Sequence, residues 1–198
     1  MTAPDDPRPL LEFWFSDFAK SLHFEVDAAF DEALRRRFGA QQREAADGRL
    51  AHWERSADSA LALVLLLDQL PRNLFRRSAR AFATDAQALA TAGRAIARGF
   101  DTAQPADRRW YFYLPFEHSE KLADQVRSVE LFRAWAAPQF AALTDTTGRE
   151  ALERHLWFVE RHREIVERFG RFPHRNGALG RPSTDEELAF LREPNSGF

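Results

Sequence analysis

Cysteine is absent from this sequence of 198 residues, and its absence excludes several kinds of chemistry. The chain can form no disulfide, no thiolate nucleophile, no iron–sulfur cluster and no cysteine-based zinc site. Any metal would need histidine and carboxylate ligands. A chain without cysteine suits a reducing compartment, so we expect a cytoplasmic protein. The first segment, MTAPDDPRPLLEFWF, agrees with this, because it is acidic where a secretory signal requires positive charge.

Long apolar runs and a strong net charge are also missing. The longest apolar run covers residues 60–67, whereas a helix needs about 20 apolar residues to span a bilayer. We therefore expect no membrane partner. The formal net charge of −2 provides no overall field that would recruit nucleic acid, so none is expected as a partner.

Large aromatic rings are abundant by contrast. The sequence has 18 Phe and 5 Trp and is 44% hydrophobic, which predicts a core built on rings. A chain of this length can bury such a core unaided, so we expect a single domain over residues 1–198. Between the Gly and Pro residues the apolar positions follow helical rather than alternating spacing. The expected fold class is all-α.

The spacing of apolar residues predicts two helices near the N-terminus. Asp6 and Pro7 are typical of the start of a helix, and the first predicted helix carries Trp14 on its apolar stripe. The second is predicted from Val26 to Phe38, with Gly39 ending it.

Several later helices are also predicted. The run LALVLLLDQL is rich in Leu and Ala, which favours a central helix over a buried strand. Three pairs have capping-box spacing and predict helix starts: Thr84 with Gln87, Thr147 with Glu150, and Thr184 with Glu187. The longest helix is predicted from Arg149 to Phe169, with His155 and His162 in its apolar stripe and Gly170 at its end.

The first of three polar segments that follow apolar helices is Asp68–Asn73. It closes the most apolar helix, so we expect Asp68 to be partly buried and to need a partner. Arg72 lies one helical turn away and could supply it. The structural alternative is a salt bridge with Asn73 as a cap.

The second segment, residues 110–120, runs from aromatic residues through a proline into Glu117, His118, Ser119 and Glu120. Acidic neighbours favour protonation of His118, which makes it a candidate acid or base. The structural alternative is that Ser119 and Glu120 start the next helix and place negative charge at its positive end.

The third segment, residues 170–181, has three Gly and one Pro, which argue against a regular helix. Its basic side chains could point donors at one anion. These are Arg171, His174, Arg175 and Arg181. The structural alternative is that the arginines bind helix carbonyls and acidic caps. The similar sequences Pro71-Arg72-Asn73 and Pro173-His174-Arg175-Asn176 suggest two corners that meet across a groove.

Known catalytic motifs are absent. The sequence lacks HExxH, GxSxG, GxxxxGK[ST] and a GxGxxG that follows a strand. A metal site would require His118, His162 and His174 to converge with Glu117 or Glu120, which spacing does not establish. We therefore predict no metal and no cofactor.

Five motifs resemble a known family. These are LEFWFSD, LLLDQLPRNLFR, FATDAQALA, YFYLPFEHSE followed by Gln125, and FGRFPHRNGALGRPSTDEELAFL with a terminal SGF. Together they resemble the bacterial family of domain of unknown function 924 over nearly the whole chain. The resemblance implies a tetratricopeptide-like superhelix of antiparallel helix pairs and no established activity. Arg77 stands where this family usually has glycine, which affects the turn there.

The leading hypothesis is a binding protein, in which helix ends form a groove for an anionic small molecule or an acidic peptide. The residues expected to hold the ligand are Arg72, Asn73, Arg171, Arg175, Asn176 and Arg181. The alternative is an acid–base enzyme, such as a hydrolase, whose catalytic residues would be His118, His174, Glu117, Glu120 and Asp68. A third hypothesis is a protein-interaction scaffold. The first two require the three polar segments to meet in space, and the oligomeric state is open.

Overall fold

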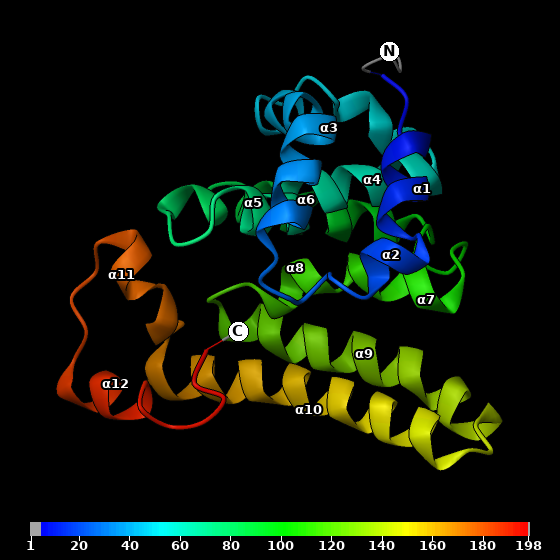
Figure 1. Ribbon diagram of the computed structural model, residues 1–198. Coiled ribbons are helices and arrows are strands. Elements are labelled where there is room, and N and C mark those ends of the chain that lie inside the picture. Colours follow the sequence, from blue (N-terminus) through cyan, green and yellow to red (C-terminus); the bar gives the residue numbers. More distant parts are fainter. Residues whose placement is uncertain (1–4, 198) are drawn as a thin grey trace. The chain divides into compact units, whose positions relative to one another are not determined.

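The computed structural model describes residues 5–197 (Figure 1). Every regular element in that range is a helix, so the all-α prediction is confirmed. The chain divides into two compact units, one ending at Pro115 and the other beginning at Phe116. The single domain and the tetratricopeptide-like superhelix stay predictions. In the part of the chain that is described, no helix is long and apolar enough to cross a membrane.

The first unit is built around one apolar helix, α4 (Ala57–Leu67). Every residue from Ala60 to Leu67 is buried, because the helix is apolar on all sides and is enclosed by its neighbours. Helices α1, α3, α5 and α6 and the 3-10 turns η1 and η3 contact it. The other elements of the unit are α1 (Arg8–Trp14), α2 (Asp17–Lys20), α3 (Ala28–Ala46), η1 (Ala51–Arg55), α5 (Gln69–Leu74), η2 (Ala79–Ala81), α6 (Asp85–Ala97), α7 (Ala106–Arg109) and η3 (Trp110–Phe112). The predicted central helix is therefore confirmed.

The predicted end of the second helix at Gly39 is wrong. Helix α3 continues to Ala46 and buries Gln42 and Ala45 on its last turns, so packing outweighs the weak helix propensity of Gly39. The chain leaves the helix at Gly48, whose φ of 75° lies in the left-handed region that favours glycine. The first predicted helix, α1, begins one residue later than expected, at Arg8 after Pro7.

The three predicted capping pairs have different outcomes. Thr184 forms the complete capping box with Glu187 at the start of α12. Thr84 does precede α6, but its hydroxyl donates to the Leu67 carbonyl at 2.5 Å and does not cap the helix. Asp145 caps the longest helix in place of Thr147, accepting from the Gly148 N–H at 2.6 Å.

The second unit is a helical hairpin with a shorter C-terminal part. Helices α9 (Leu122–Ala142) and α10 (Thr146–Phe169) lie side by side and run in opposite directions (Figure 1). Gly170, with a φ of 67°, ends α10 as predicted. Helix α8 (Leu114–Glu117) contains the boundary between the units, and η4 (Pro173–Arg175), α11 (Asn176–Leu179) and α12 (Asp185–Phe190) follow α10. Residues 170–181 were predicted to lack a regular helix, and the structure differs there only by the single turn α11.

The register of the hairpin follows from two side-chain contacts. The Phe132 ring lies 5.0 Å from the His155 ring, and Arg133 pairs with Glu160. Because the helices are antiparallel, the first turns of α9 are level with the last turns of α10. A small core joins the end of α10 to α12, and its buried members are Ile165, Val166, Phe172 and Phe190.

Candidate functional site

The second and third polar segments meet inside the second unit. The main-chain N–H of Phe172 donates to the Glu120 carboxylate at 2.8 Å, and Arg181 donates to the same carboxylate at 2.6 and 2.8 Å. Arg175 donates to the carbonyl of His118 at 3.0 Å. The proximity that sequence spacing could not establish is therefore present for these two segments. The first segment, residues 68–73, belongs to the other unit, and its convergence with them stays a prediction.

The arginines of the third segment are engaged by the protein itself. Arg171 holds Glu187 with two nitrogens, at 2.6 and 2.8 Å. Arg181 also donates to the side-chain oxygen of Asn176 at 2.9 Å. Arg175 is buried, with its guanidinium 4.4 Å from the centre of the Phe172 ring. An anion at Arg171 or Arg181 would therefore compete with a carboxylate already bound in a two-nitrogen geometry.

Glu187 links the loop to the last helix. The hydrogen bond from Arg171, helped by the N–H of Thr184 and the Asn176 amide, lowers its pKa to about 2 against the opposing effect of burial. Its carboxylate also completes the capping box of α12. These contacts are those of the structural alternative considered from the sequence, in which arginines bind acidic caps.

A buried hydrogen-bonded pair lies nearby, between Glu117 at the end of α8 and His162 on α10. Glu117 Oε1 is 2.9 Å from His162 Nδ1, and both side chains are more than nine-tenths buried. The same nitrogen lies 2.8 Å from the carbonyl oxygen of Phe158. Because both neighbours accept hydrogen bonds, Nδ1 carries hydrogen.

The surrounding histidines set the charge of Glu117. Burial is the largest influence and raises its pKa, but it is outweighed by the charge and hydrogen bond of His162 and the charges of His118 and His155. The resulting pKa lies below the usual value, so Glu117 is ionised. Burial lowers the pKa of His155, which packs on Phe132, while the charge of Glu117 opposes that shift. The half-buried ring of His118 lies 6.2 Å from that of His162.

Three buried oxygens around this pair lack hydrogen-bond partners among the described residues. They are Glu117 Oε2, Gln125 Oε1 and Ser128 Oγ. Gln125 is fully buried, and its amide nitrogen donates to the carbonyls of Glu117 and Ser119 at 2.6 Å each, which holds the start of the second segment. The hairpin register places Gln125 and Ser128 level with the turns of α10 around His162. A buried polar atom without a partner costs about 1–3 kcal/mol, so such a group is unusual away from sites that admit water or ligand.

Sequence reasoning placed His162 in a helix stripe and considered it only as a metal ligand, not as a catalytic residue. A histidine in a stripe of apolar core residues is a signal that sequence analysis could have used, because a buried imidazole requires a polar partner. Glu117 supplies that partner, 45 residues earlier in the chain. His174 is half-buried, with its ring 5.5 Å from that of Phe172. Glu120 pairs with Arg181 and does not orient His118 by any contact described above.

The predicted residues of the first segment form ion pairs within the first unit. Asp68 is fully buried and accepts from the Gln69 amide at 2.7 Å, and Arg72 lies 3.4 Å from it. Arg72 also holds Asp85 with two nitrogens, at 3.0 and 3.1 Å. Asn73 donates to Asp31 at 2.9 Å, and the same carboxylate pairs with Arg76. This arrangement joins α3, α5 and α6.

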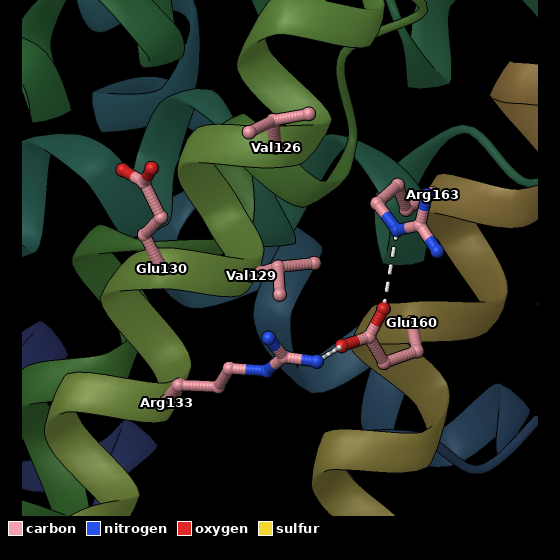
Figure 2. A pocket seen from close by; sticks show the side chains of 6 residues that line it. All are labelled: Val126, Val129, Glu130, Arg133, Glu160 and Arg163. Carbon is pink, nitrogen blue, oxygen red and sulfur yellow. Dashed lines mark hydrogen bonds and ion pairs between the residues drawn. The ribbon is translucent and has the colours of Figure 1, made fainter.

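A groove of about 350 Å³ runs between α9 and α10 on the hairpin (Figure 2). Val126 and Val129 contribute its apolar wall, and Glu160 pairs with Arg133 across it and with Arg163 on its own helix. None of the residues predicted from the sequence lines this groove. Within residues 5–197 no group of three or more His, Asp or Glu side chains is arranged to hold a metal ion.

Comparison with known proteins agrees with the motifs. A family model described as "Bacterial protein of unknown function (DUF924)" matches residues 10–195. The chain is similar to a solved structure of ATU0120, a protein of unknown function from Agrobacterium tumefaciens. The two share 42% sequence identity over 94% of this chain and 96% of that chain, with a TM-score of 0.80. No match was found among curated proteins.

Proposed function

Since this chain belongs to the bacterial DUF924 family, whose description gives no activity, we propose a function from the site itself. The second unit is an acid–base catalyst that works through His162 and Glu117. The observation that carries this proposal is the buried pair, in which an ionised carboxylate holds His162 Nδ1 at 2.9 Å. A carboxylate in that position fixes the tautomer and the orientation of the imidazole ring.

The other residues of the cluster fit supporting roles. His118 is half-buried and is the more accessible of the two rings, so it is suited to contact a substrate. Gln125 holds the carbonyls of Glu117 and Ser119 and thereby fixes the segment that carries His118. The proposed reaction class is hydrolysis: His162 Nε2 accepts a proton from an attacking water, and His118 delivers a proton to the leaving group.

A panel of chromogenic carboxyl esters and phosphate esters tests the proposal. Wild type is compared with Glu117→Gln, His162→Gln and the exposed control Glu153→Gln, after circular dichroism has established that each is folded. We expect the first two substitutions to lower kcat/KM by about a hundredfold or more and the control to leave it unchanged. Equal rates for wild type and His162→Gln, or no hydrolysis by wild type, would reject this function.

Anion binding by the third segment is a second candidate, and the bidentate pairs Arg171–Glu187 and Arg181–Glu120 favour it in one respect. They show carboxylate-binding geometry, so an acidic peptide could replace either glutamate. Arg175 and Asn176 would then lie beside the ligand. Arg72 and Asn73 belong to the other unit and stay a prediction as ligand-binding residues. Titration of a fluorescent polyglutamate peptide at two salt concentrations tests this candidate. Salt-independent binding, or none, would exclude it.

A further inference from the structure

The first unit contains a small pocket that none of the predicted site residues lines. It has a volume of about 220 Å³ and lies where the ends of α3 and α5 meet the start of α6. The lining residues that bear on its chemistry are Gln42, Arg43, Asp47, Phe75, Arg80 and Thr84. This volume is below the range of drug-sized ligand sites, so it suits a small molecule.

Two arginines face this pocket without a carboxylate partner. Neither Arg43 nor Arg80 forms an ion pair with any residue in the described part of the chain, unlike Arg72 nearby, which holds Asp85. The guanidinium of Arg80 lies 3.9 Å from the centre of the Phe75 ring. Stacking on the ring holds the guanidinium in place while its N–H edge stays available to an acceptor. The pocket therefore presents two cations whose charge is not neutralised by a direct partner.

The Gln42 side chain supplies an amide at the same pocket. Only 4% of the residue is exposed, and no other side chain or carbonyl within residues 5–197 makes a hydrogen bond to its amide. A ligand oxygen in the pocket would give the Gln42 amide an acceptor.

The start of α6 follows directly on the pocket wall. Thr84 lines the pocket, but its hydroxyl is used by the Leu67 carbonyl, so no side-chain cap occupies the first N–H groups of this 13-residue helix. The N–H of Asp85 donates to the Phe82 carbonyl, so what the start of the helix contributes to the pocket is the positive end of its dipole, which favours an anion. Asp47 is the opposing charge in the pocket wall, and Arg49 pairs with it at 2.7 Å. The Gln87 amide covers the Ala46 carbonyl at the end of α3.

We propose that this pocket binds the phosphate group of a small organic phosphate. Donors from Gln42 and Arg43 on α3 and from Arg80 on η2 approach from different elements, which matches the several oxygens of a phosphate better than the two of a carboxylate. The rest of the ligand lies against the exposed stack of Arg80 and Phe75. This binding site is separate from the catalytic residues proposed in the second unit and does not depend on them.

Calorimetric titration of the full chain tests the proposal with phenyl phosphate, inorganic phosphate and benzoate as probes. We expect phenyl phosphate to bind more tightly than inorganic phosphate, and benzoate to bind least. Arg43→Gln and Arg80→Gln should each weaken phenyl phosphate binding by about tenfold. Arg36→Gln, an exposed substitution on the same helix α3 with the same change of net charge, is the matched control and should bind as wild type does.

Two results would overturn the proposal. One is the absence of heat and of amide shifts at Gln42 and the first turn of α6 when phenyl phosphate is added at millimolar concentration. The other is equal affinity for Arg43→Gln, Arg80→Gln and Arg36→Gln, which would mean that the anion responds only to overall charge. A Glu117→Gln chain is expected to bind phenyl phosphate normally, so failure of the catalytic proposal leaves this test unaffected.

Discussion

The Glu120 carboxylate accepts hydrogen bonds from two nitrogens of Arg181, at 2.6 and 2.8 Å, although the two residues are 61 positions apart. Burial is the largest influence on the pKa of Glu120 and raises it, but the hydrogen bonds from Arg181 and from the Phe172 N–H outweigh burial and bring the pKa below its usual value. This contact fixes the loop after α10 against the segment that carries Glu117 and His118.

Removal of the Glu120 carboxylate should destabilise the second unit. Glu120→Ala leaves the partly buried Arg181 and the Phe172 N–H without their acceptor, and we expect a loss of about 1–3 kcal/mol in the free energy of unfolding. Glu130→Ala is the control, because its pair with Arg127 is exposed and should contribute about 0.5 kcal/mol or less. Urea unfolding of the full chain measures both. Equal midpoints would show that the Glu120 contact has little weight.

Acidification should destabilise the first unit through His23. Its Nε2 lies 2.8 Å from the Trp14 carbonyl and must donate, so Nδ1 accepts from the Tyr111 hydroxyl at 2.7 Å. Burial lowers the pKa of His23 to about 4, from 6.5. The unfolded chain therefore binds the proton at a higher pH than the folded chain does. The contribution of His23 to stability is complete above pH 6.5 and is lost as the pH falls towards 4, by about 1.4 kcal/mol per pH unit.

Urea unfolding across that pH range, compared with His23→Gln, measures this effect. The wild-type curve should fall more steeply than that of the variant, since the substitution removes the titrating group and nothing else that ionises. Parallel curves would contradict the neutral, buried state of His23. Nuclear magnetic resonance of the ring nitrogens at about pH 5 should also show the Nε2–H tautomer.

Alanine substitutions at Gly39, inside α3, and at Gly48, after its end, should change the stability of the protein in opposite directions. At Gly39, inside the helix, a Cβ would meet nothing closer than 3.8 Å, so Gly39→Ala should stabilise the protein by about 1 kcal/mol. At Gly48 the φ of 75° disfavours any Cβ, so Gly48→Ala should destabilise it by about 1 kcal/mol. Thermal unfolding measures the pair, and shifts of the same sign would refute the argument.

Arg77 occupies a conformation that glycine would adopt more easily. Its φ is 60°, in the left-handed region. Arg77→Gly should stabilise the protein by up to about 1 kcal/mol, because it removes the Cβ clash. Arg77→Ala keeps the Cβ and should give no such gain. If alanine and glycine have the same effect on the unfolding midpoint, the turn is not strained.

Local features account for what could be predicted correctly about the fold. The apolar composition of α4 and the Thr184–Glu187 capping box each act over a few residues, and both are found as expected. Thr84 shows the limit of such patterns. Its spacing from Gln87 is that of a capping pair, but packing brings the Leu67 carbonyl to its hydroxyl, and that bond replaces the cap.

The candidate site was predicted only in part, for the same reason. Its segments 117–120 and 171–181 were selected by their polar residues, and the structure brings them together. The partner of Glu117 was missed, because the antiparallel pairing of α9 with α10 decides which stripe residue of α10 reaches it.

The sequence by itself determined the all-α class, the family and the positions of most helices, because helical hydrogen bonds and caps form between residues a few positions apart. Only the tertiary structure decided that Glu117 holds His162, that Glu120 holds Arg181, and that Arg43 and Arg80 share a pocket without a carboxylate partner in the described chain. Contacts between residues so far apart in the chain depend on how the helices pack. The packing decides which carboxylate meets which basic side chain, and sequence spacing alone cannot predict these pairs.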